Sequence, residues 1–152
     1  MNYTLKEIKS CSATAENPDA LSGQGGKANN GRKGCPCVEP LAAGVTKTLL
    51  HKLGSGTIRK IWCTIPPEHP EHLRNLILRM YWDGQGIPSV EVPLGDFFGI
   101  AHGRQKNMVT PYVGMQDAKG FNCFIPMPFQ KEVMISIEND SDTDVDMFFY
   151  QI

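Results

Sequence analysis

Three carboxylates and several aromatic residues lie close together in residues 79–99, which gives this segment the residue types needed for carbohydrate chemistry. Aromatic rings stack on the apolar faces of sugars, whereas carboxylates accept hydrogen bonds from hydroxyl groups or act as acid, base or nucleophile. We therefore predict a sugar site in this segment. Its catalytic candidates are Glu91 and Asp83, and its substrate-binding candidates are Trp82, Asp96 and Phe97.

The same carboxylates have a structural interpretation that the sequence leaves open. In that interpretation Asp83 begins a turn with Gly84, Asp96 caps a helical turn, and Glu91 pairs with Arg79 or Arg74. Glu91 lies between two valines in a short expected strand, so its side chain points to the face opposite both of them. If that face is buried, the carboxylate must be paired or neutral.

His102 follows the two phenylalanines of this segment and is a further substrate-binding candidate, as a base or as a contact. The other histidines, His51, His69 and His72, have no convergent partners by spacing. The sequence contains neither the nucleophile elbow of the α/β-hydrolases nor a His-Glu-x-x-His motif. Histidine-based catalysis therefore has no support from a known signature.

The five cysteines suggest reduced thiols rather than a metal or redox centre. Cys35 and Cys37 are separated by one residue, which is shorter than the spacer of zinc and thioredoxin-like motifs. No second cysteine or histidine pair occurs at ligand spacing. We expect no metal and no cofactor, and the sequence leaves the role of Cys35 and Cys37 open.

Composition narrows the choice of partners. The chain has 152 residues with 15 basic and 16 acidic side chains, and a net charge of −1 does not provide the basic field that nucleic-acid binding needs. No apolar run approaches the ~20 residues of a membrane span. The first ten residues lack the apolar stretch of a signal peptide, so we expect a cytoplasmic protein without a nucleic-acid or membrane partner.

The sequence predicts that strands position the candidate residues. Apolar and β-branched runs, several of them alternating, occur at residues 45–53, 57–65, 76–82, 88–92, 108–113, 121–125, 133–138 and 145–152. Gly54-Ser55-Gly56 looks like a hairpin connection, and residues 68–74 fit one helical turn. No segment keeps a helical period. We predict an all-β protein, a single antiparallel jelly roll made of two packed sheets.

Residues 1–44 differ from this pattern and are predicted to form an N-terminal arm and a long loop, followed by the jelly-roll domain at residues 45–152. The segment 11–44 is rich in Gly and Asn and shows no clear hydrophobic period. Its apolar content is too low for packing on its own domain, so we expect it to wrap a neighbouring subunit. Residues 124–129, stiffened by two prolines, are expected to be core or an oligomer contact.

Several long motifs resemble the DUF2961 family, which is also classed as glycoside hydrolase family 172. They run in order through most of the chain, at residues 12–18, 56–62, 73–84, 88–99, 125–129, 137–139 and 150–152. The resemblance implies a jelly-roll protein that processes furanosides, as difructose-anhydride synthases and α-fructofuranosidases do, with active sites at subunit interfaces.

Two departures from the family pattern bear on activity. Members usually carry two jelly rolls, and their catalytic glutamates come from the second, which the resemblance does not find in this chain. Gln85 stands where members often have Glu after the Asp-Gly pair. The resemblance thus implies the first roll alone, without the family's own catalytic pair.

Two functions follow, and the sequence leaves both open. The first is a glycoside hydrolase-like protein that binds or processes a furanoside at a subunit interface. The second is a non-catalytic jelly roll that self-assembles as a structural or capsid-like building block. In either case we expect a closed homo-oligomer, a trimer or hexamer, because a ring of rolls restores the contacts that one roll lacks.

Overall fold

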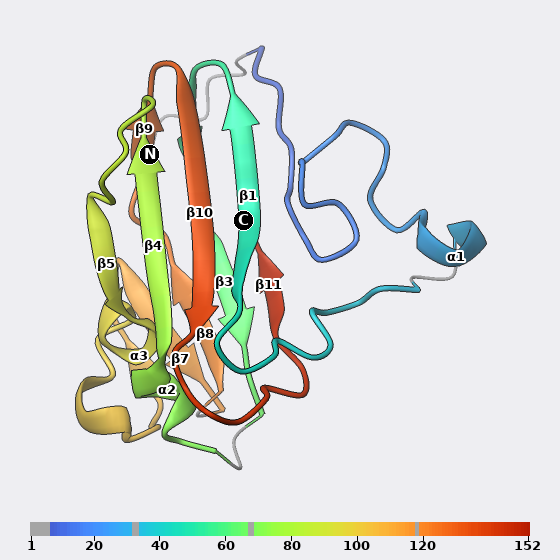
Figure 1. Ribbon diagram of the computed structural model, residues 1–152. Helices are drawn as coiled ribbons and strands as arrows, with labels where there is room; N and C mark the ends of the chain where they lie inside the picture. The colour runs from blue at the N-terminus through green and yellow to red at the C-terminus, as the bar shows by residue number, and fades with distance from the viewer. Residues whose placement is uncertain (1–6, 32–33, 67–68, 118) are drawn as a thin grey trace.

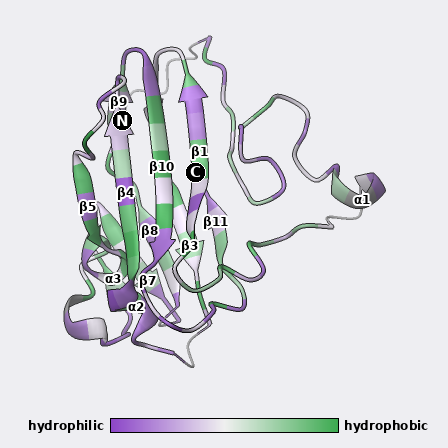
Figure 2. Cartoon of the chain, viewed as in Figure 1, coloured by the Kyte–Doolittle hydropathy of each residue, from purple (hydrophilic) through white to green (hydrophobic). Residues whose placement is uncertain are grey.

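The computed structural model describes residues 7–31, 34–66, 69–117 and 119–152. Its longest strands show directly why the chain forms sheets. In β10 (Glu132–Asn139), Val133, Ile135 and Ile137 are buried and alternate with less buried residues. Successive side chains of a strand point to opposite faces, so this pattern produces one face for the core and one for solvent. Figure 2 shows the alternation as hydrophobic and hydrophilic bands along β10.

Four strands make the first sheet, in the order β1-β10-β4-β5. The other three are β1 (Thr46–Leu53), β4 (Leu76–Trp82) and β5 (Val90–Pro93). All neighbours are antiparallel, and β10 lies between β1 and β4. Figure 1 shows these strands side by side at the front of the molecule.

A second sheet packs behind the first, in the order β11-β3-β8-β7-β6. Its strands are β11 (Phe149–Gln151), β3 (Ile61–Thr64), β8 (Gly120–Cys123), β7 (Val113–Gln116) and β6 (Met108–Val109). A separate pair joins β2 (Gly56–Ile58) to β9 (Met127–Phe129). The helices are short: α1 (Ala28–Gly31), α2 (His72–Asn75), α3 (Leu94–Phe97) and the 3₁₀ turn η1 (Ala101–Gly103). The prediction of an all-β antiparallel sandwich is confirmed.

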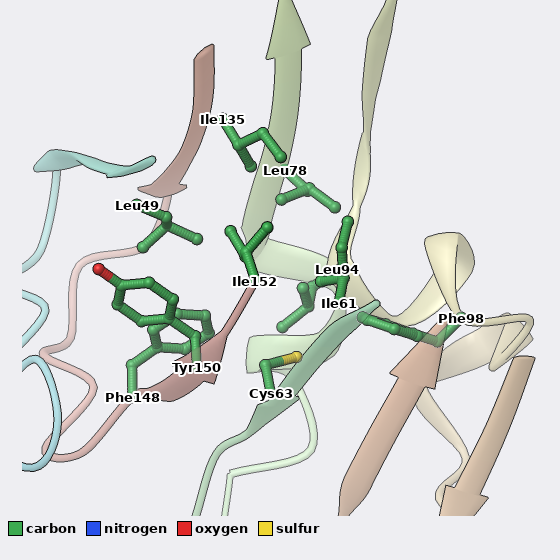
Figure 3. Close-up of a pocket in the computed structure, with 10 residues that line it drawn as sticks. All are labelled: Leu49, Ile61, Cys63, Leu78, Leu94, Phe98, Ile135, Phe148, Tyr150 and Ile152. Atoms are coloured by element: carbon green, nitrogen blue, oxygen red, sulfur yellow. The ribbon is translucent and has the colours of Figure 1, made fainter. Parts of the chain in front are cut away.

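Side chains from both sheets meet in one hydrophobic core. Leu49, Leu78 and Ile135 of the first sheet face Ile61 and Cys63 of the second (Figure 3). The gap left among them is about 10 Å³, at the lower limit of the space that one water molecule needs. This interior therefore holds the layers together and offers no room for a ligand.

The N-terminal segment corrects one expectation. Ala13 exchanges backbone hydrogen bonds with Ile152, at 2.8 and 3.0 Å, and Ala20, Cys37 and Leu41 are buried. The expectation that residues 11–44 have too little apolar content to pack on their own domain is therefore wrong for both ends of that segment. Residues 21–27 are exposed, and Figure 1 shows this loop and α1 standing away from the sheets.

The strand connections differ from the sequence prediction in two places. The run 57–65 is divided between β2 and β3, which belong to different sheets, so the hairpin expected at residues 54–56 is wrong. Likewise, the run 108–113 contains a tight turn in which the Thr110 hydroxyl accepts the N–H of Val113 at 2.9 Å, and this turn separates β6 from β7. Both differences arise because pairing partners, rather than local pattern, decide where a strand ends.

Three smaller differences complete the comparison. β9 lies in the segment 124–129, which was expected to be core or contact, and there Phe129 is buried whereas Phe124 is exposed. The predicted helical turn at 68–74 is observed as α2, with residues 67 and 68 outside the described part of the chain. In the run 145–152, the strand itself is β11, and Val145 and Phe148 form isolated bridges to Leu41 and Val38.

In the described residues no helix is long and apolar enough to cross a membrane.

Two leucines of the first sheet test the two-layer core. Leu78 in β4 is 2% exposed, whereas Leu53 at the end of β1 is 72% exposed. We expect Leu78→Ala to lower the free energy of unfolding by about 2–5 kcal/mol, because it leaves a cavity between the sheets. Leu53→Ala should change it by about 0.5 kcal/mol or less. Urea unfolding at equilibrium measures both, and similar losses for the two variants would contradict this packing.

Candidate functional site

The register between β4 and β5 places Glu91 opposite Arg79 on the outer face of the first sheet. Glu91 Oε2 accepts a hydrogen bond from Arg79 Nε at 3.0 Å, and the guanidinium also pairs with Glu138. These bonds, led by that to Glu138, raise the pKa of Arg79. The Glu91 side chain is 55% exposed, so this is a solvent-facing ion pair, as the structural interpretation of the sequence describes.

Asp83 lies in the turn after β4, with a left-handed φ of 54° that Asp tolerates better than most residues. Its Oδ1 accepts the backbone N–H groups of Lys131 at 2.7 Å, Gln130 at 2.9 Å and Glu132 at 3.4 Å. These bonds, led by that from Lys131, lower the pKa of the carboxyl. Asp83 therefore stays ionised and connects this turn to the one between β9 and β10.

The two aromatic candidates of the sequence pack inward. Trp82 lies opposite the buried Val133 and packs against the core. Phe97 also packs against the core and meets Phe98 edge to face, with ring centroids 5.0 Å apart. Both rings thus support the fold at the borders of the sandwich.

Asp96 and His102 lie at the other end of β4. Asp96 pairs with Arg74, which belongs to α2. Asp96 does not cap a helical turn, because α3 begins two residues before it. His102 is exposed in η1, with a left-handed φ of 61°. β4 separates this end from Asp83 by roughly 20 Å, so the structure does not bring all the candidate residues together.

A shallow depression opens on the outer face of the first sheet, close to Asp83. It measures about 220 Å³ and is lined by His51, Tyr81, Gly84, Gln85, Glu132 and Met134. Because His51, Met134 and Tyr81 are in register across β1, β10 and β4, their side chains share this face. The strands that carry them lie at the front of Figure 1.

Polar groups gather at the rim of the depression. His51 Nε2 lies 3.0 Å from Glu132 Oε2, and Gln85 Oε1 accepts the hydroxyl of Ser89 at 3.0 Å. Glu132 Oε1 lies 3.2 Å from the position that a Cβ on Gly84 would take, and Gly84 has a φ of +82°. A glycine at this position therefore both makes the turn and leaves space for the carboxylate.

Sequence reasoning found this region but missed its polar pair. Residues 81–85 belong to the segment chosen from composition, whereas His51 was judged to have no convergent partner. His51 and Glu132 are 81 positions apart and meet only because β1 pairs with β10. The sequence signal for this pair was the alternation within residues 133–138, because it indicates which residues beside the buried positions face solvent.

Other titratable groups have structural surroundings. Cys37 is buried, and burial, followed by the charge of Glu39, raises the pKa of its thiol. His72 is also buried, with Nε2 3.4 Å from Thr143 Oγ1, and burial lowers its pKa. Within the described ranges, no group of three or more His, Cys, Asp or Glu side chains is placed to hold a metal ion.

The fold and the depression define a β-sandwich protein with an open polar and aromatic site on one sheet. Residues 38–152 match the family model described as GH172 domain-like. The chain therefore belongs to the GH172 domain-like family and is a glycoside hydrolase-family-like protein. No curated protein matches the chain.

The hydrogen bonds that Asp83 accepts from residues 130–132 form what we call the Asp83 clamp. Two variants test it, one that removes the acceptor and one that removes only the charge. Asp83→Gly keeps the left-handed turn but removes the acceptor, so we expect a lower urea midpoint at pH 7. Asp83→Asn keeps an acceptor oxygen but loses the charge, so its urea midpoint at pH 7 should lie between those of wild type and Asp83→Gly.

The pH dependence of the same variants gives a second measurement. Because folding lowers the pKa of Asp83, its charge stabilises the folded state above about pH 4, and this stabilisation is lost as pH falls below that value. Asp83→Asn should therefore lose less stability than wild type between about pH 5 and pH 3. Parallel acid profiles for the two proteins would contradict the clamp.

Proposed function

We propose that the protein binds a furanoside in the depression on the outer face of the β1-β10-β4-β5 sheet. The observation that carries this proposal is the composition of the lining, which combines an aromatic ring, a carboxylate–histidine pair and an amide in one open hollow. Sugars present apolar C–H faces and hydroxyl edges, and such a lining offers a partner for each. Membership of the GH172 domain-like family supports a carbohydrate ligand.

Each side chain has a role in the proposed complex. Tyr81 and Met134 form the apolar floor on which a sugar ring lies. Glu132 accepts hydrogen bonds from hydroxyl groups, and His51 orients it through their 3.0 Å contact. Gln85 supplies an amide in a turn that Asp83 holds in place, so Asp83 positions the site rather than reacting in it.

Hydrolysis of the bound sugar needs a second carboxylate. Glycosidases use two, about 5–5.5 Å apart in retaining enzymes and about 6.5–9.5 Å apart in inverting ones. Among the described residues that line the depression, Glu132 is the carboxylate. We therefore propose that turnover, where it occurs, uses a carboxylate from a neighbouring subunit across an interface. Glu91 lies on the same outer face, and its catalytic role stays a prediction.

A matched pair of glutamates tests the binding site. Glu132 and Glu71 both pair with a histidine at 3.0 Å, but Glu71 lies outside the depression. We expect Glu132→Gln to weaken binding of aryl furanosides about 10- to 100-fold, because hydrogen bonds to a charged group are lost. Glu71→Gln should bind like wild type. Saturation-transfer NMR titrations measure both, and equal affinities in the two variants would contradict the site.

The second candidate, self-assembly without catalysis, is favoured by the exposed loop at residues 21–27 and by α1, which stand away from the sheets. We propose that this loop contacts a neighbouring copy in a trimer or hexamer. Light scattering after size exclusion at micromolar concentration should then give a multiple of the 16.8 kDa chain mass. A monomer would contradict assembly and the interface site together, whereas an oligomer that binds no furanoside would favour the structural role.

A further inference from the structure

The outer face of the second sheet carries another group of aromatic and amide residues, separate from the depression. The strand registers place Gln151, Trp62, Asn122, Gly114 and Val109 in one row across β11, β3, β8, β7 and β6. Residues in register point to the same side of a sheet, and the next residue of β3, Cys63, points into the core. The row therefore faces solvent on the side of the molecule opposite the depression.

Trp62 leans across the neighbouring strand in this row. Its indole Nε1 lies 4.0 Å from the position that a Cβ on Gly120 would take, and Gly120 belongs to β8. The indole therefore lies beside β8 at Gly120. Trp62 is half-buried, so part of its side chain is open to solvent.

Two further aromatic rings extend this surface. Phe124 follows Asn122 by two positions and is 48% exposed, and Tyr112 is 62% exposed. The N–H of Phe124 donates to the carbonyl of Tyr112 at 2.7 Å, so the two residues are cross-strand neighbours. Tyr112 lies two strands across and two residues along from Trp62, which is roughly 12 Å. The aromatic surface is therefore longer than one sugar ring.

Among the outward residues of the five described strands, the polar side chains are uncharged, and Lys60, just before β3, adds one positive charge. The Asn122 amide, which donates to the Gly120 carbonyl at 3.3 Å, lies between Trp62 and the strand of Tyr112. Lys60 Nζ is 5.9 Å from the centre of the Phe124 ring. None of the outward positions on these five described strands is acidic. The face thus matches a ligand with apolar faces and neutral hydroxyl groups.

We propose that this aromatic platform, formed by Trp62, Asn122, Phe124 and Tyr112, binds a neutral oligosaccharide chain. Stacking on the rings supplies the affinity, and the Asn122 amide bonds to hydroxyl groups between them. The platform makes and breaks no covalent bond; it holds a polymeric sugar on the protein. This inference stands independently of furanoside binding in the depression, because it rests on other residues and the other sheet.

The test uses native gels cast with inulin, a polymer of fructofuranose, or with dextran, a polymer of glucopyranose. We expect at least one polymer to retard the wild-type protein. Tyr112→Ser and Asn122→Ala, both of which alter exposed or half-exposed side chains, should each raise the dissociation constant about tenfold, which corresponds to loss of one stacking or hydrogen-bonding contact. Glu71→Gln, which lies outside both the platform and the depression, should be retarded like wild type.

A fluorescence measurement assigns the contact to Trp62. The chain has two tryptophans, so Trp82→Phe leaves Trp62 as the sole reporter. The retarding polymer should protect this indole from quenching by acrylamide. No retardation by either polymer, or equal retardation of wild type and Tyr112→Ser, would overturn the proposal.

A protein partner gives a different result. Protection of Trp62 that grows with protein concentration in the absence of sugar would show that a second copy covers the face, and it would also overturn the proposal. Glu132→Gln alters the depression and Tyr112→Ser alters the platform, so binding of aryl furanosides and of the polymer by each variant distinguishes failure of one site from failure of the other.

Discussion

Burial of one face of each sheet against the other is the constraint on which the rest of the structure depends. In β10, Val133, Ile135 and Ile137 are fully buried, and this forces Glu132 and Met134 to the outer face. The pairing of β10 with both β1 and β4 then carries the same inward and outward assignment to its neighbours. The core therefore determines which side chains are available for chemistry, although it takes no part in it.

Sequence reasoning succeeded where the signal is local. The strand predicted at residues 76–82 is observed with the same bounds, because an apolar and aromatic run of strand length is followed directly by an Asp-Gly turn that ends it. It failed where the signal is not local. The glycines at 54 and 56 look like a hairpin, but the strands beside them find their partners in β10 and β9. Similarly, small buried residues such as Ala13 and Ala20 gave too little hydrophobic pattern to predict packing of the N-terminal segment.

The same distinction applies to the candidate site. Composition identified residues 79–99, but it could not show which carboxylates are already used by the fold. Asp83 is bonded to three backbone N–H groups, Glu91 to Arg79, and Asp96 to Arg74. The carboxylate that faces the depression is Glu132, whose place depends on strand pairing across most of the chain. A segment rich in acidic residues thus predicts where a site lies better than it predicts which carboxylates face that site.

Asp83 connects the fold with the candidate site. By accepting N–H groups at the start of β10, it fixes the turn that carries Gly84 and Gln85 beside the backbone of Glu132. Because the backbone hydrogen bonds of Asp83 favour its ionised form, this carboxylate cannot serve as a proton donor. A carboxylate with a structural role therefore sets the position of Glu132, the carboxylate that lines the depression. For the same reason, the proposed hydrolysis would take its acidic partner from a neighbouring subunit rather than from the carboxylates that already hold this fold together.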